Sequence, residues 1–328
     1  MNPESDYDFK IRLNLTEYKE KTEKVKKLIS EHLIGNRDNI DMVITSLIAG
    51  GHILLEGVPG IAKTLMAKLT AATLSLGFAR IQFTPDLMPS DITGTSVFNP
   101  KTLDFELRKG PVFTNVVLAD EINRAPAKTQ SALFEVMEEK QVTIDGVSHK
   151  FSDTFLVIAT QNPIEQEGTY RLPEAQIDRF GFKLSLDYPD LEQEIKILEL
   201  KNKSFKDNIT DNIQPIINED DIKQMRSIAS QTIVSNELLK YIASLVSSTR
   251  KNKNIYLGAS PRAGITILNT SKAYAALNGR DFVTPDDVVK VAYPALRHRL
   301  ILTPEKEMEG ISNDEIISEI ISQIEVPR

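Results

Sequence analysis

The residues with the clearest chemical meaning lie in a glycine-containing loop that ends in Lys63 and Thr64. The loop fits the pattern G-x-x-x-x-G-K-[ST], except that Ala62 replaces the last glycine. Glycine lets backbone N–H groups turn toward phosphate oxygens, and the start of a following helix adds partial positive charge. Lys63 is expected to reach the β- and γ-phosphates, and Thr64 to offer its hydroxyl to Mg²⁺. The pattern therefore predicts binding of ATP with Mg²⁺.

The segments around this loop fit the same prediction. An apolar run at 52–56 predicts a strand before the loop, and the segment from Ala62 to about Leu76 predicts a helix after it. Because Ala62 falls where that helix should begin, we expect a helical backbone there and room for the methyl group. An ordinary strand-to-helix turn is the alternative, which the Lys-Thr pair disfavours. The loop residues expected to bind nucleotide are Gly57, Val58, Pro59, Gly60, Ile61, Ala62, Lys63, Thr64 and Leu65.

A pair of carboxylates, Asp120 and Glu121, follows four apolar residues at 116–119. Such a run predicts a buried strand that delivers both acids at its carboxyl end, where sheets of α/β proteins bind ligands. Asp120 is expected to hold Mg²⁺, and Glu121 to orient and deprotonate the water that attacks the γ-phosphate. Strands that end in solvated acids are common, so the pair alone is a weak signal. Downstream of a phosphate-binding loop it becomes a strong one.

The elements that must position these residues alternate between strands and helices. Beyond the strand at 52–56, apolar runs at 79–84, 115–119 and 155–160 predict strands, and helical segments separate them. This alternation predicts an α/β fold of the P-loop NTPase type, with a parallel sheet sandwiched by helices. A small all-α domain is expected to follow, because no strand pattern persists after Tyr188. We expect an N-terminal arm and helix at 1–32, a nucleotide-binding domain at 33–188 and a helical domain at 189–328.

Helices are also expected outside this alternating region. Residues 1–15 have the character of a loose arm, and the charge-rich segment from Thr16 to His32 predicts an exposed helix capped by Thr16. A second helix is predicted from Asn39 to Ala49. Near the end of the chain an amphipathic helix should pack its apolar face against its own domain, and the isoleucines on that face are Ile316, Ile317, Ile320, Ile321 and Ile324.

Two further pairs of short segments are predicted to form hairpins. One pair, at 93–98 and 103–108, flanks the turn-forming residues 99–102. The other pair, at 141–144 and 147–151, flanks Asp145-Gly146, a dipeptide suited to a tight two-residue turn. The hairpins either cover an edge of the sheet or reach toward a partner, and the sequence leaves both interpretations open.

The composition limits what else the chain can do. It has 328 residues, a formal net charge of −7 and no cysteine. The acidic balance argues against a general nucleic-acid surface, and without cysteine there are no disulfides, thiolate metal sites or cysteine nucleophiles. The four histidines lack the spacing of metal ligands. No apolar stretch is long enough to span a bilayer and the N-terminus has no signal-peptide core, so we expect a cytoplasmic protein without membrane insertion.

Two smaller features have no assigned part in this chemistry. His52 lies in the predicted strand before the phosphate-binding loop and is most simply a partly buried imidazole with satisfied hydrogen bonds. The basic cluster Arg297-His298-Arg299 lies in the helical half of the chain. Such clusters are usually solvated, and contact with a neighbouring molecule is the alternative.

Three longer stretches resemble the MoxR family of AAA+ ATPases. They are LADEINRAPAKTQSALFEVMEEKQVTIDG, IATQNPIEQEGTYRLPEAQIDRF and GASPRA, and the resemblance runs from about Leu33 to about Leu300. It implies ATP hydrolysis with Mg²⁺, a helical lid domain and a homo-oligomeric ring, expected to be hexameric. It also implies chaperone-like remodelling or maturation of partner proteins, expected to carry a von Willebrand factor A domain. Alanine at the position of Ala62 is usual in this family.

The resemblance assigns two arginines to nucleotide sensing. Arg179 matches the arginine finger that completes the ATP site of the neighbouring subunit. Arg262 matches sensor 2, which contacts the γ-phosphate and reports the nucleotide state to the lid. On the residues alone, Arg179 could instead form a salt bridge with Asp178 or be solvated, and Arg262 could be a surface arginine.

The resemblance assigns three more residues to the nucleotide. Asn162 matches sensor 1, whose amide could bond the γ-phosphate or the attacking water. Ile34 and Gly35 would lie against the adenine.

Three other functions remain open at this point. A chelatase-like motor subunit, which drives metal insertion into a tetrapyrrole, would share the hairpin inserts. A nucleic-acid-stimulated AAA+ motor is disfavoured by the acidic charge and by the lack of a basic or aromatic stripe, so nucleic acid is not an expected partner. A scaffold that binds ATP without hydrolysing it is disfavoured by the presence of both Glu121 and Arg179.

Overall fold

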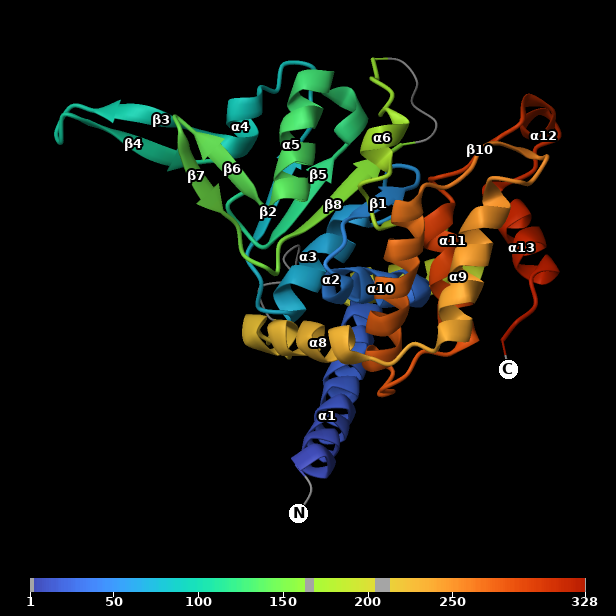
Figure 1. Cartoon of the computed structure of the whole chain (residues 1–328). Helices are drawn as coiled ribbons and strands as arrows, with labels where there is room; N and C mark the ends of the chain where they lie inside the picture. Colours follow the sequence, from blue (N-terminus) through green and yellow to red (C-terminus); the bar gives the residue numbers. More distant parts are fainter. Residues whose placement is uncertain (1–2, 163–167, 204–212, 328) are drawn as a thin grey trace.

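A five-stranded parallel sheet forms the centre of the computed structural model, which describes residues 3–162, 168–203 and 213–327 (Figure 1). The strand order is β2-β5-β8-β1-β9, and each neighbouring pair is parallel. All five carboxyl ends therefore meet at one edge, which confirms the predicted fold class. The strands are β1 (Ile53–Glu56), β2 (Phe78–Gln82), β5 (Val116–Asp120), β8 (Leu156–Gln161) and β9 (Phe182–Ser185).

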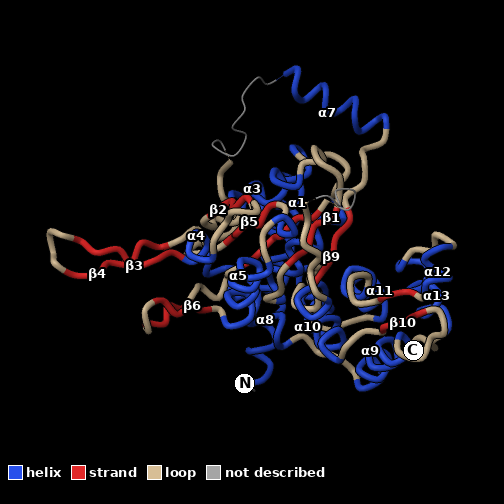
Figure 2. The backbone as a smooth tube through the Cα atoms, turned by 90° about the horizontal axis from the view of Figure 1, so that it is seen from above, coloured by secondary structure: helices blue, strands red, loops and turns tan. Residues whose placement is uncertain are grey.

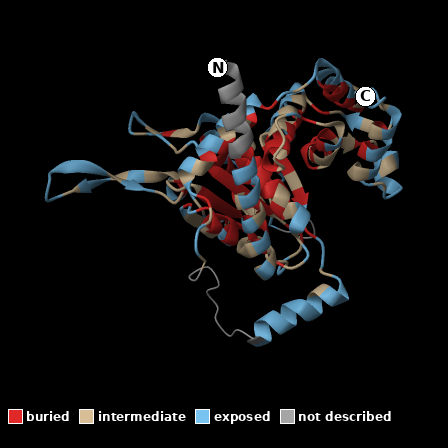
Figure 3. Cartoon of the chain, turned by 90° about the horizontal axis from the view of Figure 1, so that it is seen from below, coloured by how far each residue is buried: buried red, intermediate tan, exposed pale blue. Residues whose placement is uncertain are grey.

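Helices cover both faces of the sheet, which explains why its central strands β5, β8 and β1 are buried except for the last residue of β8 and of β1. Along β1, Ile53 and Leu55 join the apolar cluster that contains α2 (Arg37–Ala49) and α3 (Lys63–Thr73). Leu54 points the other way, into the cluster formed by α5 (Ala127–Glu139). Figure 3 shows the buried strands between these two layers. This arrangement fixes the ends of the strands, where polar side chains can gather.

The first helix is longer than its composition predicts. Helix α1 spans Pro3–His32, so Thr16 lies inside it and is no N-terminal cap. The expectation of a loose arm is wrong for residues 3–15, which are helical. Leu15 and Tyr18 are buried against the body of the protein, and this anchored part can propagate the helix toward the N-terminus at little cost.

The C-terminal half is helical and packs against α1 and α2 in one continuous core. Ile316, Ile317 and Ile320 are buried there, which confirms that the isoleucine stripe packs against the rest of the chain. One short antiparallel pair, β10 (Ile255–Leu257) and β11 (Ile301–Leu302), was not predicted. The helices are α7 (Leu191–Lys203), α8 (Glu219–Gln231), α9 (Asn236–Thr249), α10 (Pro261–Leu277), α11 (Pro285–Leu296), α12 (Pro304–Met308) and α13 (Asn313–Gln323).

Both predicted hairpins are present. β3 (Gly94–Asn99) pairs with β4 (Asp104–Lys109), and β6 (Gln141–Ile144) pairs with β7 (Val147–Lys150). Figure 1 shows the β3–β4 hairpin extending well away from the body, and Phe98, Leu103 and Phe105 on it are exposed. Most of helix α7 also stands apart from the rest of the chain (Figure 2). The remaining short helices are α4 (Pro89–Thr93), η1 (Ile122–Arg124) and α6 (Glu174–Ile177).

No helix in the described part of the chain is both long and apolar enough to cross a bilayer.

Candidate nucleotide site

The phosphate-binding loop leaves the carboxyl end of β1 and enters α3, as predicted. Gly57 has no room for a side chain, because a Cβ atom there would lie 2.9 Å from the Leu186 carbonyl oxygen. Gly60 has a φ of +86°, a conformation that glycine adopts without strain. Lys63 donates from Nζ to the Gly57 carbonyl at 2.6 Å and to the Gln161 carbonyl at 3.4 Å. The lysine therefore lies across the loop, where a phosphate group would bind.

Ala62 does not have the helical backbone that we expected. Its φ and ψ are 64° and 25°, in the left-handed region, and α3 begins one residue later at Lys63. This left-handed backbone favours glycine, which the general loop pattern has at this position, and alanine is strained there by about 1 kcal/mol. The alanine is nevertheless accommodated, since its side chain packs against the main apolar cluster.

Asp120 and Glu121 lie at the same edge of the sheet, joined by Thr160. Asp120 ends β5, and the buried Thr160 hydroxyl on β8 donates to its Oδ1 at 2.6 Å. The same hydroxyl accepts the Glu121 backbone N–H at 2.9 Å. Glu121 has a φ of +56°, and strained backbone at a non-glycine residue is typical of functional sites. Thr160 thus fixes the carboxylate of Asp120 and the backbone of Glu121, a role that was not predicted from the sequence.

Strand β2 supplies two more partners that were not predicted. Arg80 donates to Asp120 Oδ2 at 3.0 and 2.6 Å, and Gln82 donates to Glu121 Oε2 at 2.8 Å. Arg124 also forms an ion pair with Glu121 at 3.1 Å. Arg80 and Gln82 are two residues apart and so share one face of the strand, and that alternation beside a carboxylate-bearing strand was the available signal. Both carboxylates are therefore held in place before any metal binds.

Asn162 completes this edge. It directly follows β8, is buried, and comes next to Gln161, whose carbonyl oxygen accepts from Gly57 N–H at 3.3 Å as well as from Lys63. Thr64 and Leu65 lie in the first turn of α3. The structure thus brings the loop, the carboxylate pair and Asn162 to one edge of the sheet, which is the arrangement that nucleotide binding requires.

The oxygen ligands needed for Mg²⁺ are also available at this edge. Asp120 offers a carboxylate and Thr64 a hydroxyl, both hard oxygen donors of the kind that Mg²⁺ prefers. The described residues contain no group of three or more His, Cys, Asp or Glu side chains that could hold a metal by themselves. Magnesium sites of nucleotide enzymes commonly use one or two protein ligands together with phosphate oxygens and water, so the residues fit such an ion.

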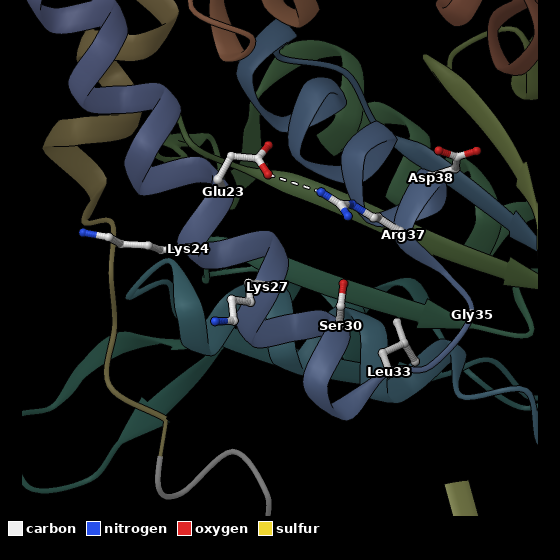
Figure 4. Close-up of a pocket in the computed structure, with 8 residues that line it drawn as sticks. All are labelled: Glu23, Lys24, Lys27, Ser30, Leu33, Gly35, Arg37 and Asp38. Atoms are coloured by element: carbon white, nitrogen blue, oxygen red, sulfur yellow. Dashed lines mark hydrogen bonds and ion pairs between the residues drawn. The ribbon is translucent and has the colours of Figure 1, made fainter. Parts of the chain in front are cut away.

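Gly35 lines a cavity of about 750 Å³ beside α1 (Figure 4). Its φ of +82° favours glycine, and the Gln193 side chain from α7 lies against it. Asn39, just beyond, donates to the carbonyl oxygen of Ser185 at 3.2 Å, at the carboxyl end of β9. The cavity is therefore on the side of the sheet where the strands have their carboxyl ends, and the contact of Gly35 with a nucleobase stays a prediction. Ile34 is next to this glycine but does not line the cavity; the other lining residues are Glu23, Lys24, Lys27, Ser30, Leu33, Arg37 and Asp38.

Arg179 and Arg262 meet at the opposite end of the sheet. Both form ion pairs of 2.8 Å with Glu138, Arg179 to Oε2 and Arg262 to Oε1. Glu138 lies in the last turn of α5 beside Met137, whose carbonyl oxygen lies 3.1 Å from Nε2 of His52, the residue before the start of β1. At about 3.3 Å per residue, this end of β1 is roughly 16 Å from the loop at its other end.

This placement changes the expected role of Arg262. We expected Arg262 to contact the γ-phosphate and to report the nucleotide state to the helical lid. In the structure its guanidinium is beside Arg179, at the end of the sheet away from its own phosphate-binding loop. The alternative interpretation, a salt bridge between Arg179 and Asp178, is wrong. Asp178 pairs with Arg299 instead.

The cluster Arg297-His298-Arg299 joins the helical half to the segment that carries Arg179. The buried Arg299 pairs with Asp178 at 2.6 Å and donates to the carbonyl oxygens of Phe180 and Gly181 at 2.7 and 3.3 Å. Burial lowers the pKa of Arg299 from its ordinary value, and the nearby Asp178 opposes that shift. The cluster is therefore a structural junction and is not simply solvated.

Comparison with known proteins supports the assignment. Residues 52–182 match the family model described as "ATPase family associated with various cellular activities (AAA)", and residues 247–320 match the AAA lid domain. The crystal structure of a candidate ATPase from Cytophaga hutchinsonii matches with a TM-score of 0.89 and 43% identity, over 100% of both chains.

Curated relatives are similar over nearly the whole chain. The uncharacterized protein YeaC of Bacillus subtilis is 45% identical, over 91% of this chain and 92% of YeaC. Chaperone MoxR1 of Mycobacterium tuberculosis is 40% identical, over 90% of this chain and 80% of MoxR1. A magnesium-chelatase subunit homolog of Methanocaldococcus jannaschii is more distant, at 27% identity over 75% of this chain and 65% of the homolog. Similarity of this degree to MoxR1, together with the two family matches, shows that the chain belongs to the MoxR family of AAA+ ATPases.

Proposed function

We propose that this protein hydrolyses ATP with Mg²⁺ at sites shared between the subunits of a cytoplasmic ring, hexameric by resemblance, and that hydrolysis remodels or matures a partner protein. The carboxyl edge of the sheet carries the proposal. There, Lys63 lies beside the end of β8, and Thr160 on the same strand holds both Asp120 and Glu121. Membership of the AAA+ family supports the same activity.

Each residue at this edge has a definite task in the proposal. The loop N–H groups and Lys63 bind the phosphates, and Asp120 with Thr64 would hold Mg²⁺, which supplies charge neutralisation at the phosphates. Glu121 takes a proton from the attacking water, and for that its carboxylate must leave Gln82 and Arg124. Asn162 orients the water or the γ-phosphate.

The two arginines at the far end of the sheet support the proposal that each ATP site is shared between subunits. Arg179 and Arg262 lie together on Glu138, roughly 16 Å of strand from the loop of their own subunit. Within one chain they do not complete the site. If subunits pack so that this end meets the nucleotide edge of a neighbour, both arginines face the neighbour's γ-phosphate. Such fingers contribute about 10³- to 10⁵-fold to hydrolysis rates.

The hydrolytic part is tested with Glu121→Gln. The variant should bind a fluorescent ATP analogue with an affinity close to that of the wild type, because its shape is kept. Its kcat should fall about 100-fold or more, since a general base contributes about 10²- to 10⁴-fold. Glu20→Gln, the same chemical change on the exposed surface of α1, serves as the control and should keep full activity. Full turnover in Glu121→Gln would remove the proposed base.

The remodelling part is tested with a von Willebrand factor A-domain protein. We expect Glu121→Gln, locked with ATP, to retain such a protein during purification, and we expect wild-type ATPase activity to rise when it is added. Phe98→Ser with Phe105→Ser, at exposed sites on the β3–β4 hairpin, should lower that stimulation without changing basal activity. If DNA stimulates hydrolysis several-fold and the A-domain protein does not, the protein is a nucleic-acid motor instead.

A further inference from the structure

Glu138 holds the two arginines that the proposed function assigns to a neighbouring subunit. One of its carboxylate oxygens pairs with Arg179 and the other with Arg262, each at 2.8 Å. The arginines come from different parts of the chain, Arg179 after α6 and Arg262 in the first turn of α10. Two guanidinium groups this close repel each other unless an anion lies between them, and Glu138 is that anion.

The surroundings favour exchange of this anion over permanent pairing. All three side chains are partly exposed, with 37% of the Glu138 side chain, 32% of Arg179 and 45% of Arg262 accessible. A cavity of about 320 Å³ opens beside them, lined in part by Glu138 and Arg179. The ring of the buried Phe134 lies 5.9 Å from the Arg179 guanidinium and limits where the arginine can go. An incoming anion can therefore reach both arginines without unfolding anything.

The charge around the cavity decides which anion can do so. Glu135 and Glu139 line the same cavity as Glu138, so three carboxylates repel any anion that approaches and raise the cost of replacing Glu138. Only an anion that can bond both guanidinium groups at once replaces the two ion pairs that Glu138 makes. A terminal phosphate has oxygen atoms for both arginines and a higher charge than a carboxylate.

We propose that Glu138 is a specificity-determining residue that makes subunit association depend on ATP rather than ADP. It occupies the two arginines until the γ-phosphate of a neighbouring subunit replaces it. With ADP in the neighbour no γ-phosphate is present, and the arginines stay on Glu138 whether or not the subunits touch. This inference rests on the proposed action of Arg179 and Arg262 across the subunit interface.

Because the γ-phosphate replaces Glu138, removing the Glu138 charge should change subunit association with ATP but not with ADP. Glu138→Gln removes two ion pairs from the free subunit, and these pairs are already absent from the ATP-bound interface. Association with ATP should therefore tighten, by about 3- to 10-fold for two partly exposed pairs. The dissociation constant with ADP should change less than 2-fold, because Glu138→Gln removes the same two ion pairs from the free subunits and from the associated ones.

The test measures subunit association by sedimentation velocity, in a Glu121→Gln background so that ATP persists. Dissociation constants are compared with ATP and with ADP for Glu138→Gln and for Glu20→Gln, a matched control that removes a charge from the exposed surface of α1 and should shift neither constant. Glu138→Asp, whose carboxylate is one methylene shorter, should shift the ATP constant in the same direction by a smaller factor. Thermal melts establish that all variants are folded.

Two outcomes would overturn the inference. One is an ATP constant for Glu138→Gln that is unchanged or weaker, and the other is an equal shift with ATP and ADP. In addition, the effect must disappear when Arg179→Ala and Arg262→Ala are also present, since Glu138 then has nothing to hold. If instead Arg179→Ala alone leaves ATP-driven association and hydrolysis unchanged, the proposed interface is wrong, which is a separate result.

Discussion

Replacing Arg299 by methionine should destabilise the protein. It should also impair the action of Arg179, because Arg299 holds the segment that carries Arg179. The Arg299 side chain is 2% exposed, and it pairs with Asp178 at 2.6 Å. Removing one partner of a buried ion pair costs about 3–5 kcal/mol, because the other charge is left uncompensated. Asp178 is 23% exposed and also accepts a hydrogen bond from Ser260 at 3.0 Å, so we expect the lower end of that range, about 3 kcal/mol.

The expected shift in melting temperature follows from the size of the chain. An unfolding entropy of about 2.1 cal/mol/K per residue, over 328 residues, converts 3 kcal/mol into a loss of about 4 °C. Arg297→Met is the control, because Arg297 pairs with Asp314, whose side chain is 45% exposed. That more exposed pair is worth about 1 kcal/mol or less, and so about 1 °C.

The ATPase rate separates a role in positioning from a role in stability alone. Arg299 also binds the carbonyl oxygens of Phe180 and Gly181, the two residues after Arg179. A misplacement of about 1 Å can cost roughly 100-fold in rate, so we expect a 10- to 100-fold lower kcat for Arg299→Met at a temperature where it is folded. Adding Asp178→Asn should recover part of the stability, because no charge is then left alone. Equal melting shifts for Arg297→Met and Arg299→Met, or an unchanged kcat for Arg299→Met, would refute this reasoning.

Three further predictions concern His52, Ala62 and Arg80. Burial lowers the pKa of His52 to about 4 from the ordinary 6.5. Since the unfolded chain binds the proton more readily, the neutral His52 makes its full contribution to the free energy of unfolding above about pH 6.5. About 3 kcal/mol of that free energy is lost as the pH falls from there through 4. Melting curves measured over this pH range should show the loss, and His52→Asn should weaken the dependence of the melting temperature on pH. Ala62→Gly should raise the melting temperature by about 1 °C and keep nucleotide binding, because it relieves a left-handed backbone; a lower melting temperature would contradict the strain. Arg80→Met should lower the Mg²⁺ concentration for half-maximal nucleotide binding about 2- to 5-fold, since Arg80 pairs with Asp120; an unchanged Mg²⁺ requirement would show that the pair does not compete with the metal.

Local patterns predicted most of the elements that carry the site. The apolar runs gave four of the five parallel strands, and Asp145-Gly146 marked its hairpin, because strand periodicity and turn chemistry are local properties. Strand β9 was missed because its four residues become a strand by pairing with β1, which is a tertiary event. Helix α1 was predicted too short because its apolar residues are sparse, and its packed C-terminal part extends it toward Pro3.

The site was predictable where one motif fixes one function. Lys63, Asp120 and Asn162 all lie at the predicted edge of the sheet, because parallel strands bring their carboxyl ends together. The backbone of Ala62 was predicted wrongly because the start of a helix was placed one residue too early. The partners Thr160 and Glu138 were missed because each acts through a contact with a distant segment, and no spacing in the sequence encodes such contacts. Arg80 was missed although its alternation with Gln82 beside a carboxylate-bearing strand was a signal.

A subunit-mixing experiment tests the central claim that the ATP site is completed by a neighbour. Lys63→Ala cannot bind ATP productively but keeps Arg179, whereas Arg179→Ala keeps an intact loop but lacks the finger. Each variant alone should be nearly inactive, and mixtures should recover activity with a maximum near equal proportions. If no ratio of the two variants hydrolyses ATP faster than either one alone, Arg179 does not act across the interface and the account is wrong.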